Sequence, residues 1–340
     1  MKNISLIILI LIFINCSLFS QTGNYRIASP DNKLTMEVTR DQNNGALTYQ
    51  VEYENQPVVL SSQLGITCNN EKWTNNLVIK KTEVRSQDTV WKPIYGERAT
   101  IRDHFNETAF IISKEGNPER ELKLIVRAYN EGIAFRYAFT EGVNGGSYLH
   151  ITGESTEFTF QEQTKAWFTP RAQTPYKLLP LKDWPDESDR PLTLELPNGL
   201  FACLGEAEMV NYARTKFKLS PDKPNTIVGS MYDDVDEIAP FNSPWRMIMV
   251  AKTAGELLQN NFLILNLNPP CALQNTSWIK PGKIMREVTL TTDGAKSLVD
   301  FAVAHHLQYI HFDAGWYGRE NLISSDATKV DARRNLDLKE

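Results

Sequence analysis

The chain has 340 residues, enough for two domains, of which 41% are hydrophobic and 23% are charged. These proportions are ordinary for a globular protein and exclude a disordered chain. The formal net charge of −5 gives no electrostatic basis for binding nucleic acid, so no nucleic-acid partner is expected.

Residues 1–20 have the pattern of a signal peptide. Lys2 supplies a positive charge, and residues 4–14 form an apolar core that is too short to span a bilayer. We therefore expect export to the periplasm or the medium, and no membrane span. Lipoprotein processing at Cys16 is the alternative, although Asn15 before it fits a lipobox poorly.

Residues 21–270 are predicted to form an N-terminal β-sandwich domain. Runs such as 34–39, 47–53 and 133–139 alternate apolar and polar side chains, as half-buried strands do. Asparagine and glycine supply the turns between them, and no helical period is sustained before a short helix near 254–258. Many short strands with regular turns favour a large sandwich.

A change of pattern near residue 270 marks the predicted domain boundary, and residues 271–340 begin a strand–helix–strand unit. Residues 283–288 predict a strand, and Thr291 and its neighbours offer a helix N-cap. Apolar residues then recur at helical spacing, and residues 307–312 predict a second, buried strand. Such a unit implies parallel strands.

The second predicted strand ends on Asp313, and Trp316 follows three residues later. In α/β barrels the chemistry lies at the carboxyl ends of the strands. An acid near an aromatic residue suits a sugar site, because the ring stacks on a sugar face while the carboxylate binds hydroxyls. On spacing alone, an equally good interpretation is that Asp313 caps a turn and Trp316 packs under a loop.

Several long motifs, in this order, resemble glycoside hydrolase family 97. They are PNGLFACLGEAEMVNYAR at 197–214, the segment 243–271, TSWIKPGK at 276–283 and IHFDAGWYG at 310–318. The resemblance implies a mutarotase-like β-super-sandwich followed by the first strands of a truncated (β/α)8 barrel. It also implies a calcium-dependent α-glycosidase that acts on an oligosaccharide or a small α-glycoside.

Family members hydrolyse α-glycosides with a pair of carboxyl groups. The resemblance places that pair on later barrel strands, expected beyond Glu340, so no catalytic residue is assigned to this chain. Asp313, Trp316 and Arg286 are the candidate substrate-binding residues. The first predicted strand and the DAGWYG segment resemble the retaining, α-galactoside-directed branch more than the inverting α-glucosidases.

The resemblance also implies an active-site calcium ion with one glutamate from the N-terminal domain, and Glu206 falls at that position. Calcium takes six to eight oxygen ligands, and carboxylates are common donors. In an extended strand Glu208 shares a face with Glu206, which makes Glu208 a second candidate. Without the resemblance, two exposed acids on an outer face would be the simpler interpretation.

Two other functions remain open. One is a non-catalytic carbohydrate-binding sandwich, a remnant of an enzyme. The other is a mutarotase-like epimerase, which needs a paired histidine and carboxylate, and neither His104 nor His150 shows such a partner in the sequence. Outside the leader, Cys68, Cys203 and Cys271 are widely spaced and predict three buried thiols without a disulfide or zinc pattern.

Overall fold

The computed structural model describes residues 23–141, 146–313, 322–326 and 336–337. The predicted signal peptide therefore lies outside the described residues. The chain divides into two compact units, a larger one of Met1–Trp91 with Thr100–Pro270 and a smaller one of Lys92–Ala99 with Cys271–Glu340. In the described part of the chain, no helix is long and apolar enough to cross a membrane.

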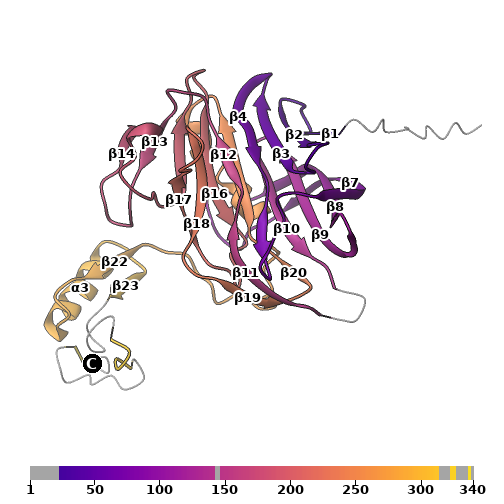
Figure 1. The fold of residues 1–340 in the computed structure, drawn as a ribbon. Helices are drawn as coiled ribbons and strands as arrows, with labels where there is room; N and C mark the ends of the chain where they lie inside the picture. Colours follow the sequence, from indigo (N-terminus) through magenta and orange to yellow (C-terminus); the bar gives the residue numbers. More distant parts are fainter. Residues whose placement is uncertain (1–22, 142–145, 314–321, 327–335, 338–340) are drawn as a thin grey trace, which may run out of the picture. The chain divides into compact units, whose positions relative to one another are not determined.

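The larger unit consists mainly of antiparallel sheets (Figure 1). A seven-stranded sheet has the order β1-β2-β3-β4-β12-β18-β17. Its strands are β1 (Asn24–Ala28), β2 (Leu34–Arg40), β3 (Leu47–Tyr53), β4 (Gln56–Gln63), β12 (Glu157–Thr159), β17 (Thr215–Leu219) and β18 (Thr226–Met231).

A ten-stranded sheet has the order β14-β13-β15-β16-β21-β10-β9-β8-β7, with β20 paired to β10. Its strands are β7 (Leu77–Trp91), β8 (Ile101–Lys114), β9 (Asn117–Tyr129), β10 (Gly132–Phe139), β13 (Lys165–Phe168), β14 (Lys177–Pro180), β15 (Leu192–Glu195), β16 (Phe201–Ala207), β20 (Phe241–Asn242) and β21 (Trp245–Ala251).

A four-stranded sheet, in the order β19-β11-β5-β6, completes the sheets of the larger unit. Its strands are β5 (Ile66–Cys68), β6 (Glu71–Lys72), β11 (Tyr148–Glu154) and β19 (Val235–Ile238). Three short helices are also present: η1 (Leu181–Asp183), α1 (Ala254–Gln259) and α2 (Phe262–Asn266).

The main core lies between the seven- and ten-stranded sheets. Alternate residues of β2, such as Met36, turn inward and are fully buried, as the period of a strand requires. Tyr49 of β3 meets Phe135 of β10 with ring centroids 5.3 Å apart, and Phe158 of β12 joins the same cluster. This arrangement agrees with the predicted β-sandwich.

A second core lies on the other face of the ten-stranded sheet. Trp245 and Met247 of β21 belong to it, whereas Ile248 and Val250 of that strand belong to the main core. Leu257 of α1 and Leu263 of α2 join this second cluster. Strand β21 is therefore buried on both faces, which is why its sequence lacks alternation.

The smaller unit contains the predicted strand–helix–strand. Strand β22 (Ile284–Glu287) pairs in parallel with β23 (Tyr309–Phe312), and α3 (Thr292–Ala304) connects them. The Thr291 hydroxyl accepts a hydrogen bond from the backbone N–H of Gly294 and caps the helix as expected. Two parallel strands with a connecting helix are compatible with the start of an α/β barrel, and the barrel itself stays a prediction.

Two burial predictions are wrong. They concern the second strand and one thiol, and the strand predicted as buried carries Tyr309 at 42% exposure. The apolar face of α3, for which only the helical spacing was predicted, buries Ala302 while Val303 is 72% exposed. One helix and two strands have too little surface to cover one another fully. Cys271 is also exposed, whereas Cys68 and Cys203 are buried as expected.

Candidate functional site

Glu206, the first calcium candidate, lies near the end of β16 and faces the space between the sheets. Its side chain is 2% exposed. One carboxylate oxygen, Oε1, accepts hydrogen bonds from the Thr215 hydroxyl and from Arg246 Nη1, while Oε2 forms an ion pair with Arg190 Nε. Two guanidinium groups therefore already neutralise this carboxylate.

Arg246 of β21 links Glu206 to a second buried acid. Its Nε and Nη2 donate to the two carboxylate oxygens of Glu154 at 2.8 and 2.5 Å, and Tyr212 donates to Glu154 at 2.7 Å. Burial alone would lower the pKa of Arg246, but the carboxylates of Glu154 and Glu206 raise it well above its ordinary value. We call Glu154, Arg190, Glu206 and Arg246 the interior charge cluster.

Glu208, the second calcium candidate, lies elsewhere. Its carboxylate Oε2 accepts hydrogen bonds from Arg136 Nη1 at 2.6 Å and from Trp245 Nε1 at 3.1 Å. Trp245 and Arg246 are consecutive in β21, so their side chains project to opposite faces. The two glutamates therefore do not share a face. The expected alternation fails because β16 ends at Ala207 and Glu208 has a left-handed φ of 54°.

These donors do not fit a calcium ion. Calcium takes six to eight oxygen ligands, of which the resemblance assigns this domain one, with Glu208 as a second candidate. The carboxylates of Glu206 and Glu208 each bind arginine, whose positive charge opposes a nearby cation. These ion pairs between arginine and glutamate can instead stabilise the larger unit.

The outer face of the ten-stranded sheet carries a stack of arginine and aromatic side chains that sequence reasoning missed. The centre of the Trp245 ring lies 4.3 Å from the guanidinium carbon of Arg136 and 4.6 Å from that of Arg127. Arg127 also covers Phe105 at 4.5 Å. Glu107 pairs with Arg127 at 2.7 Å. These cation–π contacts stabilise the same face of the sheet, where Arg136 and Trp245 also bind the carboxylate of Glu208.

The smaller unit brings two predicted substrate-binding residues together. Arg286 lies in β22, and Asp313 directly follows β23 at the carboxyl edge of the parallel pair. Arg286 Nη2 and Asp313 Oδ2 are 2.7 Å apart, and their side chains are 60% and 43% exposed. The third candidate, Trp316, lies outside the described residues.

Glu287, which sequence analysis did not single out, ends β22 at the same edge and is 4% exposed. Its carboxylate accepts hydrogen bonds from the backbone N–H and hydroxyl of Thr289, at 2.9 and 2.7 Å, and from the Leu290 N–H. Glu287 therefore fixes the loop between β22 and α3. An acid at a strand end was the sequence signal that could have identified it.

His150 has acidic partners that the sequence did not reveal. Its Nδ1 lies 2.7 Å from Asp236 Oδ1, and its Nε2 lies 3.6 Å from Asp234 Oδ2. The hydrogen bond to Asp236 raises the pKa of His150. The partner acids are exposed, and they are more than eighty positions away in the chain, so no local pattern could predict the pair.

Comparison with known families decides the classification. A family model described as "Glycosyl-hydrolase 97 N-terminal" matches residues 27–270, more than half of the chain. The chain belongs to glycoside hydrolase family 97. The resemblance seen in its motifs is thereby confirmed.

Two curated relatives of this family 97 chain are similar over most of its length. One is a retaining α-galactosidase of Bacteroides thetaiotaomicron, 24% identical over 100% of this chain and 56% of the relative. The other, described as a probable retaining α-galactosidase, is from Streptomyces bingchenggensis and is 22% identical over 92% of this chain and 50% of the relative. The chain thus spans about half the length of these relatives.

Solved structures agree on the fold. A family 97 enzyme of Pseudoalteromonas sp. strain K8 in complex with acarbose has a TM-score of 0.78 and 26% identity, covering 86% of this chain and 47% of that chain. A β-arabinopyranosidase has a TM-score of 0.76 at 20% identity, covering 84% of this chain and 50% of that chain, which shows a shared fold alone.

Proposed function

We propose that this family 97 chain is part of an exported α-glycosidase that hydrolyses terminal α-galactosides with retention, with α-glucosides as the alternative substrates. The family match over residues 27–270 carries this proposal. Relatives described as retaining or probable retaining α-galactosidases support the galactoside. Export rests on the signal-peptide pattern of residues 1–20.

Asp313 and Arg286 are proposed to bind sugar hydroxyls. A carboxylate accepts hydrogen bonds from sugar hydroxyls, and a guanidinium donates hydrogen bonds to them. An ion pair of the two, with no net charge, can therefore bind a neutral sugar. Retaining hydrolysis needs two carboxyl groups about 5–5.5 Å apart, one of them a nucleophile. Asp313 is held by Arg286 at 2.7 Å, an arrangement that suits binding better than nucleophilic attack. No catalytic residue is assigned to this chain.

A calcium requirement stays a prediction for the whole enzyme, and Glu206 and Glu208 are not assigned as its ligands. Removing calcium with a chelator and restoring it should abolish and recover hydrolysis. Glu206→Gln should lower the free energy of unfolding, because Glu206 forms ion pairs with Arg190 and Arg246. The dependence of hydrolysis on calcium concentration should stay unchanged. A selective loss of calcium affinity in that variant would instead make Glu206 a ligand.

Steady-state hydrolysis tests the proposed function. The complete gene product would be assayed on nitrophenyl α-galactoside and nitrophenyl α-glucoside. A higher kcat/KM for the galactoside is expected. A higher value for the glucoside would select the alternative substrate, and failure to hydrolyse either would refute the glycosidase.

A further inference from the structure

The outermost strand of the ten-stranded sheet, β7, has one unpaired edge. It pairs with β8 on one side and ends the strand order on the other (Figure 1). Among the described residues, the backbone of 81–91 makes no hydrogen bond outside the pairing with β8. We call residues 81–91 the free edge. An edge of this kind is a template on which another strand can pair.

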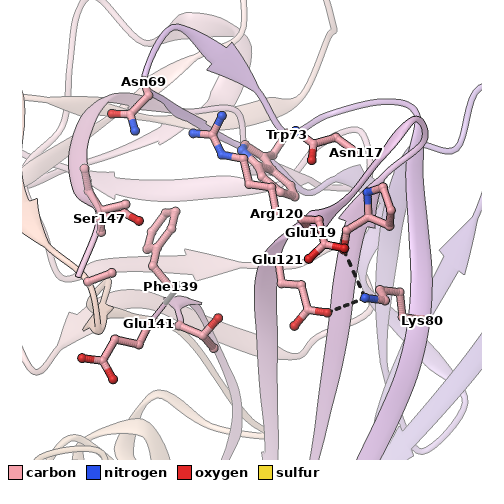
Figure 2. Close-up of a pocket in the computed structure, with 14 residues that line it drawn as sticks. Asn69, Trp73, Lys80, Asn117, Glu119, Arg120, Glu121, Phe139, Glu141 and Ser147 are labelled. Carbon is pink, nitrogen blue, oxygen red and sulfur yellow. Dashed lines mark hydrogen bonds and ion pairs between the residues drawn. The ribbon is translucent and has the colours of Figure 1, made fainter. Parts of the chain in front are cut away.

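A β-bulge at Lys80 marks where the free edge begins. The register between β7 and β8 shifts at this residue and is then unbroken to the end of the strand. Lys80 turns toward β9, where its Nζ donates to the Pro118 carbonyl at 3.1 Å and to Glu121 at 2.6 Å, beside the pocket of Figure 2. Bulges and prolines commonly protect sheet edges, and the free edge contains neither.

The free edge also exposes apolar side chains. Val84 is 78% exposed and Val90 is 64% exposed. Valine favours strands because its branched side chain packs against a neighbour across the sheet, and here that contact exists on one side only. A second strand along the free edge would supply the missing neighbour.

The residues around Val84 are complementary to their own reversed order. When two β7 strands pair antiparallel with Val84 facing the partner's Val84, Glu83 faces the partner's Arg85. The same charge pair forms a second time by symmetry, and Thr82 faces the partner's Ser86. Opposite charges directly across a ladder are stabilising. Registers centred one residue to either side would instead oppose two glutamates or two arginines, which is destabilising.

Arg85 can bind a second carboxylate. Its Nε and Nη2 donate to the two oxygens of Glu107 at 2.5 and 2.9 Å, but Glu107 also pairs with Arg127 at 2.7 Å. One carboxylate thus serves two guanidinium groups. The side chains of Arg85 and Glu83 are 49% and 46% exposed, so the partner's Glu83 can reach Arg85 from the edge.

We propose that the free edge of β7 is the interface of a homodimer in which two ten-stranded sheets join across a two-fold axis at Val84. Each copy presents the same surface to the other, so the contact closes on itself and does not extend into fibres. Pairing over residues 81–87 makes a small interface, and association is therefore weak and concentration-dependent. The interface contains neither of the proposed substrate residues, Arg286 and Asp313.

Sedimentation equilibrium of the 340-residue chain over a range of concentrations tests this interface, and the wild type should show a monomer–dimer equilibrium. Val84→Lys places two positive charges face to face at the axis and should raise the dissociation constant at least about tenfold. Val90→Lys is the matched control. Val90 is also an exposed valine of β7 but lies beyond the paired residues 81–87, so its variant should change the constant less than about twofold.

Cross-linking through Val84→Cys gives an independent readout. Facing Cβ atoms in an antiparallel pair are about 4.5–5.5 Å apart, near the separation that a disulfide requires. Oxidised glutathione should therefore convert Val84→Cys into a covalent dimer and leave Val90→Cys, which has the same native cysteines, largely monomeric.

Three results would overturn the proposal: a wild type that is monomeric at every concentration, equal effects of Val84→Lys and Val90→Lys, or equal cross-linking of the two cysteine variants. None of these readouts uses hydrolysis, so failure of the interface and failure of the glycosidase are distinguishable.

Discussion

Arg246 and Glu154 form a two-bond ion pair inside the sandwich, with N–O distances of 2.8 and 2.5 Å. Their side chains are 6% and 5% exposed. Glu154 ends β11 and Arg246 lies in β21, so the pair ties the four-stranded sheet to the ten-stranded sheet. Glu206 of β16 extends the contact along the ten-stranded sheet.

Breaking this pair should destabilise the larger unit strongly. Glu154→Gln removes the charge that compensates buried Arg246, and removal of one partner of a buried pair costs about 3–5 kcal/mol. Because Glu206 still faces Arg246, we expect the lower end, about 3 kcal/mol, in the free energy of unfolding measured with urea.

Lys81→Ala is the surface control for that experiment. Lys81 and Glu83 form an ion pair at 2.8 Å with side chains 66% and 46% exposed, and such pairs contribute less than about 1 kcal/mol. Equal losses in the two variants would contradict the structural role of the interior charge cluster.

Close backbone contact makes Gly132 intolerant of a side chain. A Cβ there would lie 2.7 Å from the Ile248 carbonyl oxygen and 2.8 Å from Leu263 Cδ2. Gly132→Ala should therefore cost about 1–3 kcal/mol of stability through overpacking. Gly153→Ala, whose Cβ would meet nothing within 4 Å, should change stability by less than about 0.5 kcal/mol. Thermal unfolding of both variants checks this, and a harmless Gly132→Ala would count against the close approach of β10 to β21.

His150 should titrate above its ordinary pKa of about 6.5 because its hydrogen bond to Asp236 favours the protonated ring. Because the pKa is higher in the folded state, the pair of protonated His150 with Asp236 stabilises the fold. That stabilisation is fully present below about pH 6.5 and is lost as the pH rises through the folded pKa. Proton NMR titration measures the value, with the resonance assigned from His150→Gln.

Asp236→Asn supplies the comparison for His150. It should bring the pKa of His150 down, whereas Asp234→Asn should lower it less, because Asp234 lies 3.6 Å away and Asp236 only 2.7 Å. A pKa of His150 that does not respond to Asp236→Asn would show that the pair does not form in solution.

Asp313→Asn should reduce hydrolysis by the complete gene product. A hydrogen bond to a charged group contributes about 1.5–3 kcal/mol, so kcat/KM for an α-galactoside should fall at least about tenfold. Asp300→Asn, at an exposed position of α3, is the matched control and should have no effect. Unchanged kinetics in Asp313→Asn would exclude Asp313 from the substrate site.

Local sequence pattern predicted the elements better than it predicted their partners. Alternation identified strands such as β2 and β3, and helical spacing with Thr291 identified α3. The pairing of Glu206 with Arg246 spans 40 positions, and that of Glu154 with Arg246 spans 92. Such contacts depend on sheet order, which periodicity does not encode.

Backbone detail also limited the site prediction. The shared face of Glu206 and Glu208 assumed that β16 continues, and the positive φ of Glu208 ends that alternation. By contrast, Arg286 and Asp313 do meet, because parallel strands bring their carboxyl ends to one edge. Strand direction was predictable there from the short crossover helix.

Proton NMR of nitrophenyl α-galactoside hydrolysis by the complete gene product tests the central claim most directly. Retention requires that α-galactose form first and convert to the β-anomer only by later mutarotation. We predict that order of appearance. Initial release of β-galactose, or no hydrolysis, would contradict the assignment of this family 97 chain to a retaining α-galactosidase.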